Sequence, residues 1–174
     1  MSVLAIVSIK NGAPTKSGLE AASYAANYAE SQGMTASALV AGEISGDGGL
    51  GATGIAKVLH CSEPVTDSGQ WTKLTEAAAI QLNASTIVAS HDHFGRAVAP
   101  RVAVRLKAGL VAGVTELPAN NLVRKNVFSG KAVADVAVST AIAVYTVTPN
   151  AFGVKDSPGP VSYTHLTLPT KWIV

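Results

Sequence analysis

Val3-Leu4-Ala5-Ile6-Val7 decides the fold, because this stretch is apolar at every position. A short apolar run without alternation is typical of a strand that is buried on both faces. A helix is predicted to follow, ending near Gln32, and residues 36–40 predict a second strand. Strand, helix and strand within forty residues make a βαβ unit, which predicts a parallel pair with a right-handed crossover.

Local signals predict where this first helix begins and ends. Asn11-Gly12 and Pro14 interrupt the first strand. Ser17-Gly18-Leu19-Glu20 fits a capping box, in which the serine oxygen accepts an amide and the glutamate reaches back. Gly33 is a suitable residue to close the helix. The helix is therefore expected to begin at Ser17.

The strand and helix pattern then repeats. Apolar runs predict strands at 56–61, 86–89, 110–117 and 141–147, and helical periodicity predicts helices at 69–82 and 96–108. Pro100 favours a start of the latter helix near Val98, and Gly109 favours its end. Two extended segments, 123–128 and 131–138, flank Ser129-Gly130 and predict a hairpin. The expected fold is α/β and Rossmann-like, with a mostly parallel sheet, helices on both faces and a late antiparallel hairpin.

Composition excludes several classes of protein. Of the 174 residues, 48% are hydrophobic and 14% charged, which excludes intrinsic disorder. A net charge of +2 without a basic stripe gives no indication of nucleic-acid binding. One cysteine, Cys61, excludes an internal disulfide. No apolar run approaches the roughly 20 residues that span a bilayer, and no signal peptide is evident. We expect a protein of the bacterial cytoplasm.

Two segments could be ligand sites, one for phosphate and one for a metal ion, or ordinary loops. The segment 46–54 contains two overlapping G-x-G-x-x-G matches, but no long helix follows it, which favours a connecting loop over a phosphate site. His91-Asp92-His93 follows a predicted strand and offers two metal ligands. Because His60 and His165 lie in unrelated contexts, no third ligand is evident, and a polar loop is the favoured interpretation.

Catalytic residues are not evident. No G-x-S-x-G motif occurs around Ser90 or Ser129, and no pair of carboxylates is a candidate for acid–base chemistry. Cys61 and His60 are adjacent in a predicted strand, so they face opposite ways, and Cys61 is expected to be a buried apolar residue. The sequence therefore favours a protein without its own catalytic constellation.

Arginines are concentrated in one predicted helix, at positions 96, 101 and 105. Arg101 and Arg105 are four residues apart, on one helical face. In a chain with so few charges, Arg96, Arg101 and Arg105 suggest a structural or subunit contact, while a solvated helix face is the alternative.

Four motifs in order resemble the alpha subunit of the electron transfer flavoproteins. Residues 95–110 (GRAVAPRVAVRLKAGL) resemble the stretch GR-x-L-APR-x-A-x-R-L-x-AGL, with Val98 in place of leucine. Residues 50–58 (LGATGIAKV) resemble LG-x-YGA-x-KV, with Thr53 in place of the aromatic residue. Residues 127–132 (VFSGKA) and 149–153 (PNAFG) also match, although Thr148 stands where the family often has arginine.

The resemblance implies an electron carrier rather than an enzyme. Such a subunit forms a heterodimer with a beta subunit. Through FAD it carries electrons from flavin dehydrogenases, such as the acyl-CoA dehydrogenases of fatty acid beta-oxidation, to a membrane quinone reductase. Its N-terminal domain has a fold related to adenine-nucleotide hydrolases and contacts the beta subunit, while FAD lies chiefly on a second domain. No FAD-binding motif occurs in this chain, so no FAD ligand is assigned.

The resemblance also suggests a division of the chain. Residues 1–153 are expected to form the N-terminal α/β domain, 154–160 a linker stub, and 161–174 a tail that is not native, because VSYTHLTLPTK resembles the translation of a sequencing adapter. The chain would then be a fragment of the alpha subunit that does not hold FAD alone. The alternatives are a free-standing adenine-nucleotide-binding module, for which the segment 46–54 is the candidate, and an inert gene fragment.

Overall fold

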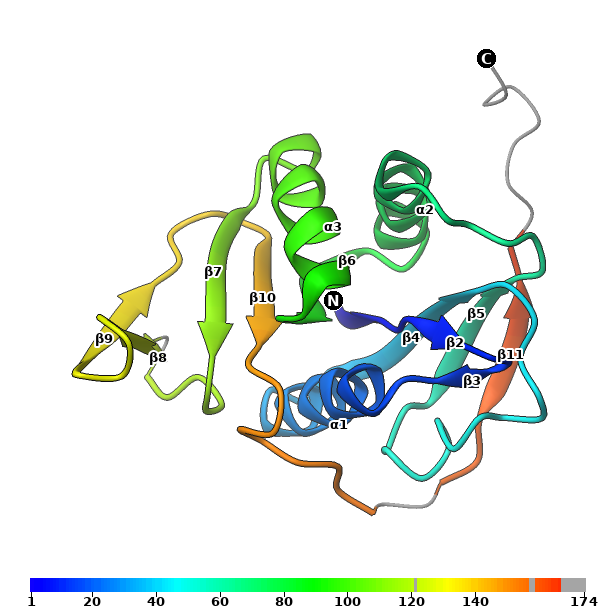
Figure 1. The fold of residues 1–174 in the computed structure, drawn as a ribbon, viewed down its shortest axis with the longest axis horizontal. Helices are drawn as coiled ribbons and strands as arrows, with labels where there is room; N and C mark the ends of the chain where they lie inside the picture. Colours follow the sequence, from blue (N-terminus) through cyan, green and yellow to red (C-terminus); the bar gives the residue numbers. More distant parts are fainter. Residues whose placement is uncertain (121, 157–158, 167–174) are drawn as a thin grey trace.

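A nine-stranded sheet forms the centre of the computed structural model, which describes residues 1–120, 122–156 and 159–166 (Figure 1). The order across the sheet is β11-β5-β4-β1-β6-β10-β7-β8-β9. Its strands in chain order are β1 (Ser2–Ile6), β4 (Thr35–Ala41), β5 (Lys57–Cys61), β6 (Ala84–Ser90), β7 (Gly109–Val114), β8 (Leu122–Val127), β9 (Ala132–Ala137), β10 (Ala143–Val147) and β11 (Ser162–His165).

The middle of the sheet is parallel and buried. β1 pairs in parallel with β4 and β6, and β10 pairs in parallel with β6 and β7. Every residue of β1 and β10 is buried. These strands are covered on both faces, which is why their sequences are apolar throughout instead of alternating. The predicted α/β, Rossmann-like fold is confirmed.

Helices cover both faces of the sheet (Figure 1). The helix α1 (Lys16–Ser31) packs with Val3, Ala5 and Val40 in one apolar cluster. The helices α2 (Ser68–Gln81) and α3 (His93–Arg105) pack with the alternate residues Leu4 and Ile6 in a second cluster. Successive side chains of β1 therefore pack in two separate apolar clusters, because neighbouring side chains in a strand point to opposite faces of the sheet.

The predicted start of α1 is wrong. Thr15, not Ser17, is the N-cap, and its hydroxyl accepts a hydrogen bond from the Gly18 amide at 3.1 Å. Before it, β2 (Ile9–Lys10) and β3 (Ala13–Pro14) form a small antiparallel pair around the Asn11-Gly12 turn. This pair brings Thr15 back over the carboxyl end of β1, where its amide donates to the carbonyl of Ser8 at 2.9 Å.

The predicted boundaries of α3 are also wrong. The helix begins at His93, three residues before the predicted segment, and ends at Arg105. Pro100 lies inside it on an exposed side, where water can satisfy the carbonyl that the proline leaves without a donor. Lys107, with φ of 51°, takes the left-handed conformation after the helix, and Gly109 is instead the first residue of β7.

The predicted hairpin is confirmed. β8 and β9 pair antiparallel from Leu122–Ala137 to Val127–Ala132. The chain turns through Phe128, Ser129 and Gly130, all with positive φ. The hairpin projects from one side of the molecule (Figure 1), and its only pairing to the rest of the sheet is the single register pair Val114–Lys125 among the described residues.

β11 was not predicted, because the sequence after residue 160 shows no strand pattern. The strand pairs in parallel with β5, with Ser162 opposite Lys57 and His165 opposite His60. Its side chains at Ser162, Tyr163 and His165 are exposed, so the pairing depends on the main chain. The segment 167–174 lies outside the described residues, and the prediction that the tail is not native stays a prediction.

Candidate functional site

The polar edge of the sheet lies where the strand order reverses. β4 and β5 follow β1 on one side, whereas β6 and β10 lie on its other side. In open α/β sheets, ligands bind at the carboxyl ends of the strands beside such a reversal. Here that position lies between the ends of β1 and β6, where the N-termini of α1 and α3 also converge.

Four side chains form a hydrogen-bonded chain across this reversal. The hydroxyls of Ser8 and Thr15 lie 2.8 Å apart, and those of Thr15 and Ser17 lie 3.3 Å apart. The Ser17 hydroxyl donates to the Asp92 carboxylate at 2.7 Å. Asp92 is the N-cap of α3, and its other oxygen accepts the Gly95 amide at 3.0 Å. The chain thus links the starts of two helices that pack on opposite faces.

Asp92 carries negative charge into this edge. Burial alone would raise its pKa, but the hydrogen bonds from the Gly95 amide and the Ser17 hydroxyl outweigh burial, so its pKa lies below the ordinary value of 3.8. The hydroxyl of Ser90, the last residue of β6, contributes to this lowering. It is buried and forms no hydrogen bond of regular geometry with the described residues.

These residues do not fit a nucleotide phosphate. A phosphate at this reversal would need free amides at a helix N-terminus and a site without negative charge. The first-turn amides of Gly18 and Gly95 already donate to Thr15 and Asp92. A phosphate beside the Asp92 carboxylate would also meet charge repulsion in a partly buried site. The edge therefore holds two helices together, and at each helix N-terminus a capping side chain already occupies one first-turn amide.

The glycine-rich segment 46–54 has its amides occupied in the same way. The Asp47 carboxylate accepts hydrogen bonds from the Gly49 amide at 3.0 Å and from the Gly51 amide at 3.3 Å. The Thr53 hydroxyl donates to the carbonyl of Leu50. The segment itself consists mostly of turns, and the next regular element is β5. This geometry favours the predicted connecting loop over the phosphate site.

The three residues of the motif His91-Asp92-His93 have different structural roles. His91 Nδ1 lies 2.8 Å from the Thr146 hydroxyl on β10, Asp92 caps α3, and His93 is its exposed first residue. Burial lowers the pKa of His91, and the positive charges of Arg96 and Lys125 lower it further. Within the residues that the structure describes, no group of three histidine, cysteine or acidic side chains could hold a metal ion.

His60 and His165 lie elsewhere, at the β5–β11 edge. Their ring centroids are 5.5 Å apart, and His60 Nε2 lies 2.8 Å from the Gly42 carbonyl. Cys61, the next residue, is fully buried in the second apolar cluster, as predicted for a small apolar residue.

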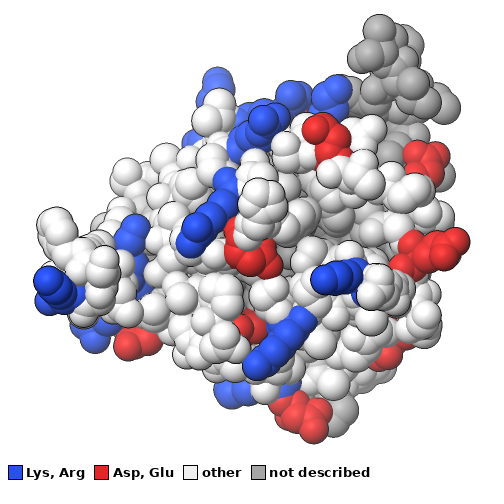
Figure 2. Space-filling view, viewed as in Figure 1, with Lys and Arg blue, Asp and Glu red and all other residues white. Residues whose placement is uncertain are grey.

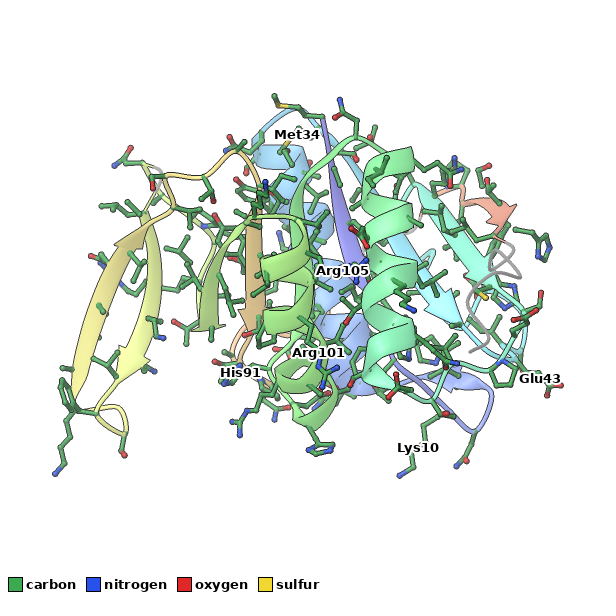
Figure 3. All side chains as sticks on the ribbon, turned by 90° about the horizontal axis from the view of Figure 1, so that it is seen from above. Lys10, Met34, Glu43, His91, Arg101 and Arg105 are labelled. Atoms are coloured by element: carbon green, nitrogen blue, oxygen red, sulfur yellow. The ribbon has the colours of Figure 1, made fainter. Side chains whose placement is uncertain are left out.

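The three arginines of α3 do not converge. Arg105 Nε donates to the Glu76 carboxylate on α2 at 2.6 Å, which joins the two helices. Arg101 lies beside Arg105 on the side of α3 that faces α2 (Figure 3), and both line a groove of about 440 Å³ between these helices. Arg96 is exposed in the first turn of α3, near His91. Neither Arg96 nor Arg101 has an ion pair with any described residue.

Sequence reasoning missed the roles of Asp92 and Gly95. Asp92 is interpreted above only as part of a polar loop, although Asp-x-x-Gly after an apolar strand has the spacing of an N-cap and the amide it binds. Gly95 is required by close packing, because a Cβ at this position would lie 1.6 Å from the carbonyl oxygen of Ser90. That contact depends on how α3 meets β6, which no local pattern reveals.

On the face seen in Figure 2, several basic side chains gather along the upper edge, and the other charged side chains are scattered over a mostly uncharged surface. Across the described parts of the chain, none of the helices has the length and apolar character required to cross a bilayer.

Comparison with known proteins gives one positive result. Curated proteins give no match to this chain. The family model described as "Electron transfer flavoprotein domain" matches residues 3–166, which include every strand of the sheet and all three described helices. The match extends beyond the four motifs to the whole folded unit, so the chain belongs to the electron transfer flavoprotein domain family.

Proposed function

We propose that this chain is the N-terminal domain of an electron transfer flavoprotein alpha subunit. Family membership supports the flavoprotein part of this proposal. The order of the four motifs supports the alpha subunit, and the observation that carries it is GRAVAPR, which lies in α3 from Gly95 to Arg101. The complete protein would be a cytoplasmic electron carrier, taking electrons from acyl-CoA and other flavin dehydrogenases and passing them to a quinone reductase.

In this proposal the domain serves as a scaffold. FAD supplies the redox chemistry, and protein supplies its binding site and surroundings. Two observations support a role without a bound nucleotide: Thr15 and Asp92 each occupy one first-turn amide of their helix, and the Asp92 carboxylate would repel a phosphate beside it. The isolated chain should therefore be colourless after purification and should bind neither AMP nor ATP in calorimetry. Stoichiometric flavin in the isolated chain, or micromolar nucleotide binding, would contradict the scaffold role.

The β8–β9 hairpin is the surface that we assign to the beta subunit. Three of its apolar side chains are largely exposed: Phe128 is 80% exposed, Val133 57% and Leu122 42%. An apolar group on a projecting element is typical of a surface that another protein covers. Arg96 and Arg101 are proposed as further contacts, since neither has an ion pair with the described residues.

Beta-subunit binding tests this assignment. Phe128→Ser is expected to weaken binding about tenfold or more, because large aromatic residues dominate interface energies. Ile80→Ser is the matched control, because Ile80 is 70% exposed but lies on α2. Both variants should melt like the parent chain. Equal affinities of Phe128→Ser and Ile80→Ser for the co-purified beta subunit would remove the hairpin from the interface.

The arginines are tested in the same assay. Alanine at Arg96 or Arg101 should reduce beta-subunit affinity and leave the unfolding midpoint unchanged. Alanine at Arg105 should also lower stability slightly, since it removes the link to Glu76. If all three variants keep both stability and affinity, the proposed role of these arginines is wrong.

A further inference from the structure

The segment after β10 follows one side of α1. This segment, residues 148–155, is called the strap here. Lys16 Nζ donates to the Asn150 side chain at 3.0 Å, and Lys155 at the other end contacts Ser23 and Asn27. Contacts at positions 16, 20, 23 and 27 of α1 recur every three or four residues, which places them along one helical face.

Glu20 is the centre of this contact. One carboxylate oxygen accepts the Asn150 amide at 2.8 Å, and the other accepts the amides of Phe152 at 2.8 Å and Gly153 at 2.7 Å. The residue is only 2% exposed. A buried carboxylate must have its oxygens satisfied, and these three main-chain donors do so.

The strap is shaped around this carboxylate. Asn150 and Gly153 have positive φ values of 62° and 81°, and the resulting turns direct successive amides to one point. The ring of Phe152 also packs edge-on against Tyr24 of α1, with centroids 5.2 Å apart. The strap therefore has a polar anchor and an apolar anchor, both on α1.

We propose that Glu20 is the positioning residue that fixes the strap to α1, and so sets the path that the chain takes after β10, along α1 and on to the β5 edge where β11 pairs. Asn150, Phe152 and Gly153 together form a carboxylate-binding nest that Glu20 fills from within the chain. This inference does not rest on the proposed function. The docking itself rests on the contacts above.

Hydrogen exchange on the full 174-residue chain tests the docking. In Glu20→Gln, the NH2 group that replaces one carboxylate oxygen cannot accept, so at least one strap amide loses its partner. The amides of residues 150, 152 and 153 should exchange about tenfold faster, as expected for loss of a hydrogen bond to a charged group. Glu30→Gln is the matched control, because Glu30 lies exposed on the same helix. Unchanged strap exchange in Glu20→Gln would overturn the proposal.

A second variant tests the nest itself. In Glu20→Ala the carboxylate is removed and the three amides face a small cavity. Added formate should restore slow exchange of these amides in Glu20→Ala, whereas formamide should not, because it carries no negative charge. If Glu20→Gln does not fold, the formate rescue of Glu20→Ala tests the proposal by itself. Equal effects of formate and formamide on the exchange of the three amides would contradict the carboxylate-binding nest. Both measurements use the chain without a partner, so they do not depend on beta-subunit binding.

Discussion

Strands β1 and β9 have five and six residues, but they are held in the sheet by different forces. β1 is wholly buried and has a neighbour on each side. β9 is an edge strand paired to β8, and its residues alternate between exposed and half-buried. Apolar packing on two faces holds β1. Main-chain pairing holds β9, with an exposed ion pair of Arg124 with Asp135 at 2.9 Å and one half-buried side chain, Val136, against the first apolar cluster.

The difference between β1 and β9 shows which strand stabilises the fold and which strand can contact another protein. A strand that is packed on both faces has no side chain left to contact another protein. A strand that is held through its main chain leaves its side chains available, and Val133 on β9 is one of these. Each prediction below therefore contrasts a change in the core or at the polar edge with a matched change elsewhere.

The largest effect is expected from Gly95→Ala. The new Cβ would lie 1.6 Å from the Ser90 carbonyl oxygen, so α3 would have to move away from β6. We expect a loss of about 4 kcal/mol in the free energy of unfolding, at the upper end for single substitutions. Gly130→Ala in the hairpin turn meets nothing within 4 Å, and its φ of 83° should cost only about 1–2 kcal/mol. Urea unfolding measures both, and equal losses would contradict the comparison.

A smaller effect is expected from Ile87→Ala in β6. Ile87 is fully buried, so its truncation leaves a cavity and should cost about 3 kcal/mol. Val133→Ala in β9 should change stability by no more than about 0.5 kcal/mol, because the side chain is already in water. Thermal unfolding of the two variants distinguishes them. A loss above that range in Val133→Ala would mean that the hairpin packs more tightly than described.

The smallest effect is expected at the polar edge, in Asp92→Ala. Loss of this cap should cost about 1 kcal/mol at pH 7. Because folding lowers the pKa of Asp92, its contribution is fully present above the ordinary value of 3.8. The contribution is lost as pH falls through the lower folded pKa. The difference between parent and variant should thus be constant from neutral pH to about pH 5 and shrink below pH 4.

Asp67→Ala is the matched control for that variant. Asp67 caps α2 through the amides of Gly69 and Gln70 and, among the described residues, forms no hydrogen bond or ion pair with another helix. Asp92→Ala should therefore cost more than Asp67→Ala at pH 7, since it also breaks the hydrogen bond to Ser17 on α1. The reverse order in urea unfolding would show that the link across the sheet edge adds no stability.

Patterns that depend on burial were predictable from the sequence. The apolar runs of β1, β4, β6 and β10 and the helical periodicity of α2 reflect contacts with the core, and these elements lie where predicted within a few residues. The hairpin was also predictable, because Ser129-Gly130 supplies a turn between two extended segments.

Features that depend on distant partners were not predictable. Glu20 has the spacing of a capping box, yet its carboxylate binds amides about 130 residues away. Pro100 suggested a later start for α3, but Asp92 provides an earlier cap, and the proline is tolerated on an exposed side. β11 has no strand pattern because its pairing uses the main chain. For Glu20 and β11 a tertiary contact decides the outcome, whereas the start of α3 is set by a local cap whose spacing the sequence does show.

The position of β10 has a consequence for the order of folding. This strand, residues 143–147, lies between β6 and β7, both of which precede it in the chain. During synthesis β7 therefore has no place beside β6 until β10 has emerged and inserted. The half of the sheet from β1 to β5 can assemble early, whereas β7 and the hairpin must wait for this strand. Parallel pairing across such sequence distances is slow, so insertion of β10 is expected to limit the folding rate.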